Sequence, residues 1–166
     1  MIVVCDTSAL INLAKINQLR LLGEMFGGVL IPQSVYDEVV TKGRGRAGTE
    51  EVENAPYIQV RELENPEDAE SYIDPLSEVD AQVIAFTKEQ SGDLIITRDR
   101  RLRRRARREG ISVYSLVELF IVAKNNGFIQ AVKPLLDELR NKGVLIREGV
   151  YQEALREAGD SEDEDE

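Results

Sequence analysis

Four acidic side chains, far apart in the sequence, follow or border apolar segments. Asp6 and Asp99 each come shortly after a short apolar run, and Glu38 and Asp80 each border the apolar face of a predicted helix. Taken singly, an aspartate after a strand is also a good helix N-cap, and an acid on a helix is most often a solvated residue. Four carboxylates in one crevice, however, would repel one another unless a cation neutralised them. The set therefore predicts a divalent-metal site.

The sequence contains no histidine, and its only cysteine is Cys5, in an apolar run. This composition excludes Ser-His-Asp triads, histidine acid–base chemistry and histidine-ligated zinc. Carboxylate ligands suit hard cations, so we expect Mg²⁺ or Mn²⁺ held by Asp6, Glu38, Asp80 and Asp99. The hydroxyls of Thr7, Ser8 and Thr97 are candidates to orient those carboxylates or water around the ion.

The segments that must position these acids alternate between short apolar strands and amphipathic helices. This pattern predicts βαβ units, and therefore an α/β protein: a three-layer α/β/α sandwich around a short central parallel sheet. In such a sheet, ligands bind outside the carboxyl ends of the strands, which is where Asp6 and Asp99 fall. The strands are expected at Ile2–Cys5, Val29–Ile31, Tyr57–Val60 (at an edge), Asp93–Thr97 and Ile111–Val113. Helices are expected at Ser77–Gln90 and Asp99–Glu109.

We expect three regions along the chain. Residues 1–115 form the α/β core, residues 116–158 form a helical extension, and residues 159–166 form a disordered acidic tail. The extension carries apolar rows that either complete the monomer core or form a dimer surface, namely Leu116, Leu119, Phe120 and Ala123.

Four motifs in this order resemble those of the PIN-domain ribonuclease family. Val3–Ile11 resembles the opening strand with its Asp-Thr/Ser-Ser motif, and Ile31–Val39 resembles the second motif, with Glu38 as the site acid. Leu76–Ala85 resembles the third motif, with Asp80 at the acidic position, and Ile96–Asp99 resembles the fourth, Thr-x-Asp. Some relatives carry two adjacent acids in the last motif, where this chain has Arg98.

The later segments resemble the C-terminal helices of a prokaryotic PIN subgroup of unsettled function. The resemblance as a whole implies a Mg²⁺- or Mn²⁺-dependent endoribonuclease acting on single-stranded or structured RNA, related to the VapC-like toxins of toxin–antitoxin pairs. It also implies a homodimer and an antitoxin protein as possible partners. Hydrolysis by one or two ions at the four acids needs no histidine and leaves a 5′-phosphate on the product.

A dense basic segment lies within this acidic chain of formal net charge −10. Arginine pairs bidentately with phosphate, so we expect the segment to hold the RNA backbone. A solvated helix face, an acidic antitoxin segment and the chain's own acidic tail are the alternative roles. The predicted RNA-binding residues are Arg98, Arg100, Arg101, Arg103, Arg104, Arg105, Arg107 and Arg108, with Lys42, Arg44 and Arg46 in a glycine-rich loop.

Three other functions compete with an RNA nuclease: a non-catalytic PIN scaffold that binds RNA or protein, a ribosomal-RNA-processing or structure-specific DNA nuclease, and a nucleotide-binding α/β protein. The last is disfavoured because no glycine-rich loop follows the first strand. The sequence has no apolar run long enough to span a bilayer and no signal peptide, so we expect a cytoplasmic protein without a membrane partner.

Overall fold

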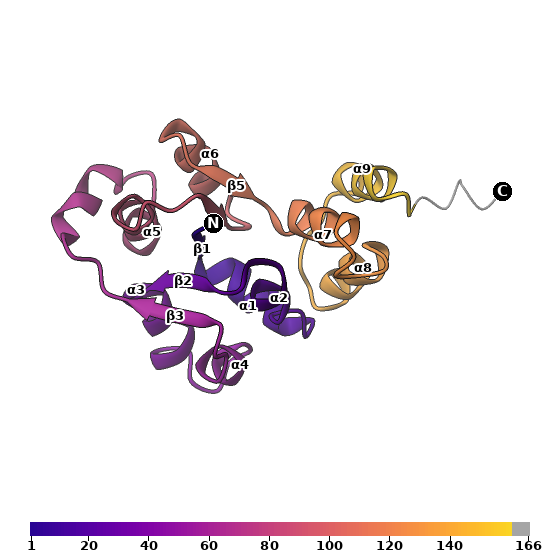
Figure 1. Cartoon of the computed structure of the whole chain (residues 1–166), viewed down its shortest axis with the longest axis horizontal. Coiled ribbons are helices and arrows are strands. Elements are labelled where there is room, and N and C mark those ends of the chain that lie inside the picture. Colours follow the sequence, from indigo (N-terminus) through magenta and orange to yellow (C-terminus); the bar gives the residue numbers. More distant parts are fainter. Residues whose placement is uncertain (161–166) are drawn as a thin grey trace.

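The computed structural model describes residues 1–160, and its elements alternate between strands and helices (Figure 1). The strands are β1 (Val3–Cys5), β2 (Val29–Pro32), β3 (Ile58–Arg61), β4 (Leu94–Ile96) and β5 (Ser112–Tyr114). The helices are α1 (Thr7–Lys15), α2 (Leu21–Phe26), α3 (Gln33–Tyr36), α4 (Thr49–Glu53), α5 (Glu78–Glu89), α6 (Arg100–Arg108), α7 (Leu116–Asn125), α8 (Lys133–Asn141) and α9 (Glu148–Ala158), with a π-helical turn η1 (Asp37–Thr41) and a 3₁₀ segment η2 (Pro66–Tyr72).

The strands form one parallel sheet in the order β3-β2-β1-β4-β5. Connections run from β1 outward to β2 and β3, and the chain then crosses back to place β4 on the other side of β1. The order therefore reverses between β1 and β4, and the carboxyl ends of these two strands flank the crevice where open α/β sheets bind ligands. Asp6 directly follows β1, and Thr97 directly follows β4.

Helices cover the sheet on both faces, which confirms the α/β sandwich expected from the sequence. The strands β1 and β4 are fully buried, because parallel strands between helical layers have no solvent face. The chain beyond β5 adds α7, α8 and α9, which gather on one side of the molecule (Figure 1). The apolar row Leu116, Leu119, Phe120 and Ala123 is buried within the monomer, so it belongs to the core and is not free to form a dimer surface.

The structure adds detail to two connecting segments. Asn17 has a left-handed backbone with φ 56°, and α2 begins after it at Leu21. The glycine-rich loop at residues 42–48 leads into the short helix α4, and Thr49 fixes this join by donating hydrogen bonds to the carbonyls of Val39 and Gly43.

The predicted acidic tail lies largely outside the described residues, at 161–166. Its first acid, Asp160, is held by the ammonium of Lys124 and accepts hydrogen bonds from the backbone N–H groups of Val132 and Lys133. Within residues 1–160, no helix combines the length and apolar character that crossing a bilayer requires.

Candidate metal-dependent active site

Asp6 lies at the centre of the crevice between β1 and β4. Its side chain is 2% exposed and caps α1 by accepting a 2.8 Å hydrogen bond from the N–H of Ala9. Ser8 donates its hydroxyl to both carboxylate oxygens at 2.9 Å, and Thr97, which follows β4, donates to Oδ2. Asp6 therefore serves as helix cap and as a fixed carboxylate at the reversal point of the sheet.

Burial is the main influence on the ionisation of Asp6. Loss of water raises the pKa of this carboxyl to about 6, although hydrogen bonds from Thr97, Ala9 and Ser8 act in the opposite direction. The negative charge of Asp80 raises the pKa of Asp6 further. Burial makes the charged form of this carboxylate unfavourable, and a nearby cation would stabilise that charged form.

Asp80 and Asp99 bring two further acids to the same end of the sheet. Asp99 caps α6 by accepting a 2.9 Å hydrogen bond from the N–H of Leu102, while its own N–H donates to Thr97 Oγ1 at 2.9 Å. Asp80 lies in the first turn of α5, whose N-cap is Ser77. Partial burial raises the pKa of Asp80, and the charges of Asp99 and then Glu38 raise it further. Electrostatic repulsion therefore links all four predicted acids.

Glu38 reaches this neighbourhood from the π-helical turn η1, which continues α3 after β2. Asp37 and Glu38 are adjacent acids here, and the structure gives them different environments. Asp37 accepts hydrogen bonds from Gln33 at 2.9 Å and Thr41 at 3.3 Å, whereas the exposed Glu38 carboxylate has no hydrogen-bond or ion-pair partner within residues 1–160. α3 packs against α5, which carries Asp80.

The four acids do not form a closed cage. Among residues 1–160, no three acidic or cysteine side chains are close enough together to enclose an ion. The donor set nevertheless fits a hard dication, because Mg²⁺ keeps several waters and is commonly held by one or two carboxylates together with substrate phosphate. Two buried hydroxyls without a hydrogen-bond partner lie within one turn of a site acid, Thr7 Oγ1 beside Asp6 and Ser34 Oγ before Glu38.

Ser34 is a site neighbour that the sequence did not single out. Its signal was its spacing of four residues from Glu38, which places both on one side of a helix. Of the three predicted supporting hydroxyls, Ser8 and Thr97 bond directly to Asp6, and Ser8 also accepts a 3.1 Å hydrogen bond from the N–H of Arg98. Thr7 makes no such bond in the described structure.

The arginines of α6 divide into two groups. Arg98, just before the helix, donates a 2.6 Å hydrogen bond to the carbonyl of Leu145, and Arg105 pairs with Glu109 at 3.2 Å and lies 4.9 Å from the ring of Tyr72. For Arg105 this agrees with the alternative of a helix face paired with nearby acids such as Glu109, whereas the contact of Arg98 with Leu145 was not predicted. The others have no carboxylate partner among residues 1–160 and comprise Arg100, Arg101, Arg103, Arg104, Arg107 and Arg108.

The second basic region, at residues 42–46, lies away from the α6 arginines in sequence and is exposed. Arg44 pairs with Glu53 of α4 through two hydrogen bonds of 2.8 and 3.1 Å. This pair raises the pKa of Arg44 and lowers that of Glu53. The loop is therefore tied to α4 through Arg44, whereas Lys42 and Arg46 have no such partner in the described structure.

Comparison with known proteins agrees with this geometry. A family model described as PIN domain matches residues 2–160, a range that includes the C-terminal helices α7–α9 as well as the sheet. No curated protein matches the chain. PIN domains are in general metal-dependent nucleases, and the acids in this chain occupy the carboxyl end of the sheet. Because the match covers almost the whole of the described chain, the protein belongs to the PIN-domain family.

Proposed function

We propose that this protein is a Mg²⁺- or Mn²⁺-dependent endoribonuclease, in which Asp6, Glu38, Asp80 and Asp99 hold the ion directly or through water. The observation that carries the proposal is the position of the buried Asp6 at the carboxyl end of β1, where Ser8 and Thr97 orient its carboxylate and where Asp99 follows the neighbouring strand β4. Four mutually repelling carboxylates destabilise a scaffold, but they suit a site that receives a dication.

The chain's own residues can perform three tasks in phosphodiester hydrolysis. When bound, the ion would supply Lewis acidity and lower the pKa of a water molecule, so that hydroxide is available to attack phosphorus. Asp6 presents an oriented oxygen because Ser8 and Thr97 fix both sides of its carboxylate. Asp99 is fixed by its capping bond, while Glu38 and Asp80 can adjust to the substrate. Attack by water forms a new P–O bond and breaks the P–O3′ bond, so we expect products with a 5′-phosphate and a 3′-hydroxyl.

A pair of neighbouring acids supplies the sharpest test. Cleavage of end-labelled single-stranded RNA, hairpin RNA and single-stranded DNA is measured with and without Mn²⁺ for the wild type, Glu38→Gln and Asp37→Asn. We expect Glu38→Gln to lose activity by about tenfold to a hundredfold, as for altered metal environments. Asp37→Asn should retain activity, because Asp37 bonds only to Gln33 and Thr41.

The alternatives are distinguished in the same assay. RNA bound but not cut by the wild type in any metal would favour a binding scaffold and contradict the nuclease. DNA cut in preference to RNA would assign a DNA nuclease. Equal loss in Glu38→Gln and Asp37→Asn would remove Glu38 from the site.

We further propose that the protein is the toxin of a toxin–antitoxin pair and that the antitoxin binds in the groove between α6 and the C-terminal helices. This groove of about 710 Å³ reaches Ser8 and Asp99 at the site and has an apolar wall that includes Leu116, Leu145 and Val150. An amphipathic antitoxin segment with acidic residues would complement that wall and the arginines opposite. Co-purification with the product of the adjacent gene, abolished by Leu145→Asp, is the expected result; recovery of the pair with Leu145→Asp would contradict the assignment.

A further inference from the structure

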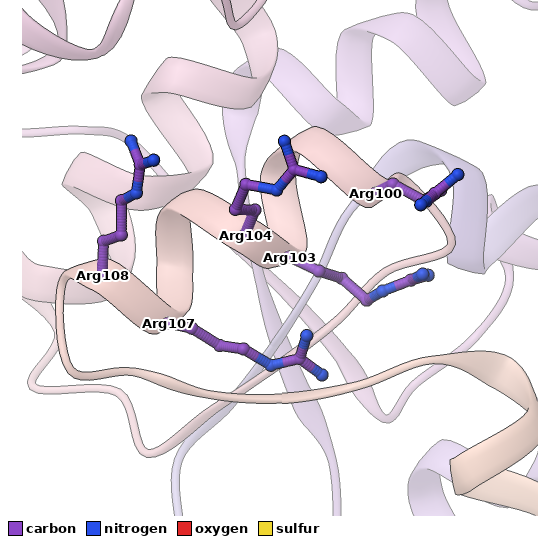
Figure 2. Close-up of a pocket in the computed structure, with 5 residues that line it drawn as sticks. All are labelled: Arg100, Arg103, Arg104, Arg107 and Arg108. Carbon is purple, nitrogen blue, oxygen red and sulfur yellow. The ribbon is translucent and has the colours of Figure 1, made fainter.

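Five arginine side chains line one shallow hollow on the surface of α6. The hollow has a volume of about 550 Å³, and the residues that line it are Arg100, Arg103, Arg104, Arg107 and Arg108. Figure 2 shows Arg103 and Arg107 extending to one side of the helix and Arg104 and Arg108 to the other, with Arg100 at the start of the helix. Among residues 1–160, no acidic, apolar or aromatic side chain lines this hollow.

These five guanidinium groups are not neutralised within the described part of the chain. None pairs with a carboxylate among residues 1–160; Arg103 donates only to the carbonyl of Arg98, at 2.9 Å. The contrast with Arg105 on the same helix is direct, because Arg105 has Glu109 and the ring of Tyr72 as partners. The hollow is therefore a concentrated positive field with no ion pair inside it among residues 1–160, although the charges of Glu118 and Asp99 act on Arg103.

The crowding has an electrostatic consequence. Partial burial and the charge of Arg107 lower the pKa of Arg103, and Arg100 adds to this effect, while the charges of Glu118 and Asp99 act in the opposite direction. Like charges placed together in this way are relieved by a bound polyanion, and the guanidinium fork matches the geometry of phosphate oxygens.

The arginine hollow begins at the candidate active site. Asp99 is the N-cap of α6, so Arg100 follows a site acid directly and Arg108 lies farther along the same helix. The axial distance from Arg100 to Arg108 is about 12 Å at a helical rise of about 1.5 Å per residue. A nucleic-acid strand advances about 3.4 Å or more per phosphate, so this length accommodates at most about four phosphates.

We propose that the arginine hollow of α6 is a backbone subsite that holds several phosphates of the same RNA strand on one side of the phosphate cleaved at the carboxylates. This inference rests on the proposed function and adds to it the path of the strand. Phosphate is favoured over an acidic protein segment because helical peptides dock through apolar anchors, and the hollow offers none. No aromatic side chain among residues 1–160 lines the hollow, so we expect the guanidinium groups to bind backbone phosphates and to add little preference for sequence.

The test measures binding separately from cleavage. Fluorescence anisotropy with a labelled single-stranded RNA is recorded in EDTA, where no divalent ion is available, for the wild type and the double variant Arg104→Gln/Arg107→Gln. The matched control is Arg20→Gln/Arg156→Gln, which removes the same charge from two exposed ion pairs outside α6. We expect the α6 variant to bind about tenfold more weakly, with a salt slope reduced by about one for each lost phosphate contact.

The outcomes separate the subsite from the nuclease. The control should bind RNA within about twofold of the wild type, and both variants should retain the wild-type circular dichroism spectrum and melting temperature. Equal weakening in the control would show a general charge effect and overturn the subsite. Failure of polyglutamate to compete with RNA supports phosphate recognition, whereas polyglutamate binding that depends on Arg104 and Arg107, without RNA binding, would assign an acidic protein partner instead. Wild-type protein that binds RNA through α6 but never cuts it would contradict the nuclease alone.

Discussion

At the scale of single residues, the structure confirms the helix-capping interpretation of two of the acids, and their metal-binding role stays a prediction. Asp6 and Asp99 are helix N-caps, as aspartate after a strand commonly is, and they follow the neighbouring strands β1 and β4 at the reversal point of the sheet. Their positions could be predicted because they depend on local strand endings. The difference between Asp37 and Glu38 could not be predicted, since it depends on which carboxylate bonds to Gln33 and Thr41. The contacts of Arg98 with Leu145 and of Arg105 with Tyr72 were equally hidden, because these partners come from segments distant in sequence, whereas the pairing of Arg105 with Glu109 is local.

Asp6 should reduce stability at neutral pH. Its folded-state pKa of about 6 lies above the ordinary value of 3.8, so the folded state prefers the neutral carboxyl. The stability that the neutral Asp6 carboxyl provides is fully present below about pH 4 and is lost as the pH rises through about 6. The total loss is about 3 kcal/mol. We expect Asp6→Asn to be inactive yet at least as stable as wild type at pH 7, measured by urea denaturation in EDTA. The difference should vanish near pH 4, and a constant difference across this range would contradict the assignment.

Divalent metal should restore the stability that the wild type loses when Asp6 is charged at neutral pH. An ion that binds only the folded state stabilises it by about 2.7 kcal/mol at a hundred times its dissociation constant. We expect the melting temperature of the wild type to rise with Mn²⁺, and that of Asp80→Asn to rise much less because one of the linked acids is lost. Asp37→Asn is the control and should respond as the wild type does. Equal rises in all three proteins would place the ion elsewhere.

At the scale of elements, the buried strands and the two N-capped helices α5 and α6 could be predicted because their signals are local. The π-helical turn η1 and the short helix α4 could not. The turn is stabilised from outside its own sequence, where Thr49 bonds to the carbonyls of Val39 and Gly43. The position of Glu38 therefore depends on a contact made by Thr49, ten residues after Val39, which the periodicity of the sequence does not reveal.

Gly43 is required for this turn. A Cβ atom built at Gly43 would lie 2.2 Å from the carbonyl oxygen of Val39 and 3.0 Å from that of Glu38. We expect Gly43→Ala to lower the free energy of unfolding by about 1–3 kcal/mol, as for other overpacked sites, and to reduce cleavage because Glu38 must move. Gly149→Ala is the matched control: it lies in α9 with nothing within 4 Å and should be neutral or slightly stabilising. Chemical denaturation of both variants measures the difference.

At the scale of the whole molecule, the parallel sheet between helical layers and the presence of a helical extension could be predicted from the alternation of segments, whereas the order of the strands could not. The attachment of the extension to the site could not. Arg98 lies in the motif that contains Asp99, and its guanidinium bonds to the carbonyl of Leu145 between α8 and α9. Arg98, which the sequence assigned to RNA, therefore joins the extension to the segment that contains Asp99.

Removing this join should loosen the extension locally. We expect Arg98→Met to accelerate hydrogen exchange in the backbone amides of residues 144–148, and to lower the free energy of unfolding by about 1 kcal/mol, the ordinary value of one hydrogen bond. Arg101→Met, an exposed arginine with no carboxylate partner in the described chain, is the control and should leave exchange unchanged. Unchanged exchange in both proteins would show that the Arg98 contact does not restrain the extension.

The carboxylate of Asp160 also has a consequence for biosynthesis. α8 begins without a side-chain cap of its own, and the acceptor for the N–H groups of Val132 and Lys133 is supplied by a residue 28 positions later in translation. While the ribosome is still making α9, the nascent α8 lacks a contact worth about 1 kcal/mol at its start. The order of synthesis therefore delays completion of this helical corner until residue 160 has emerged.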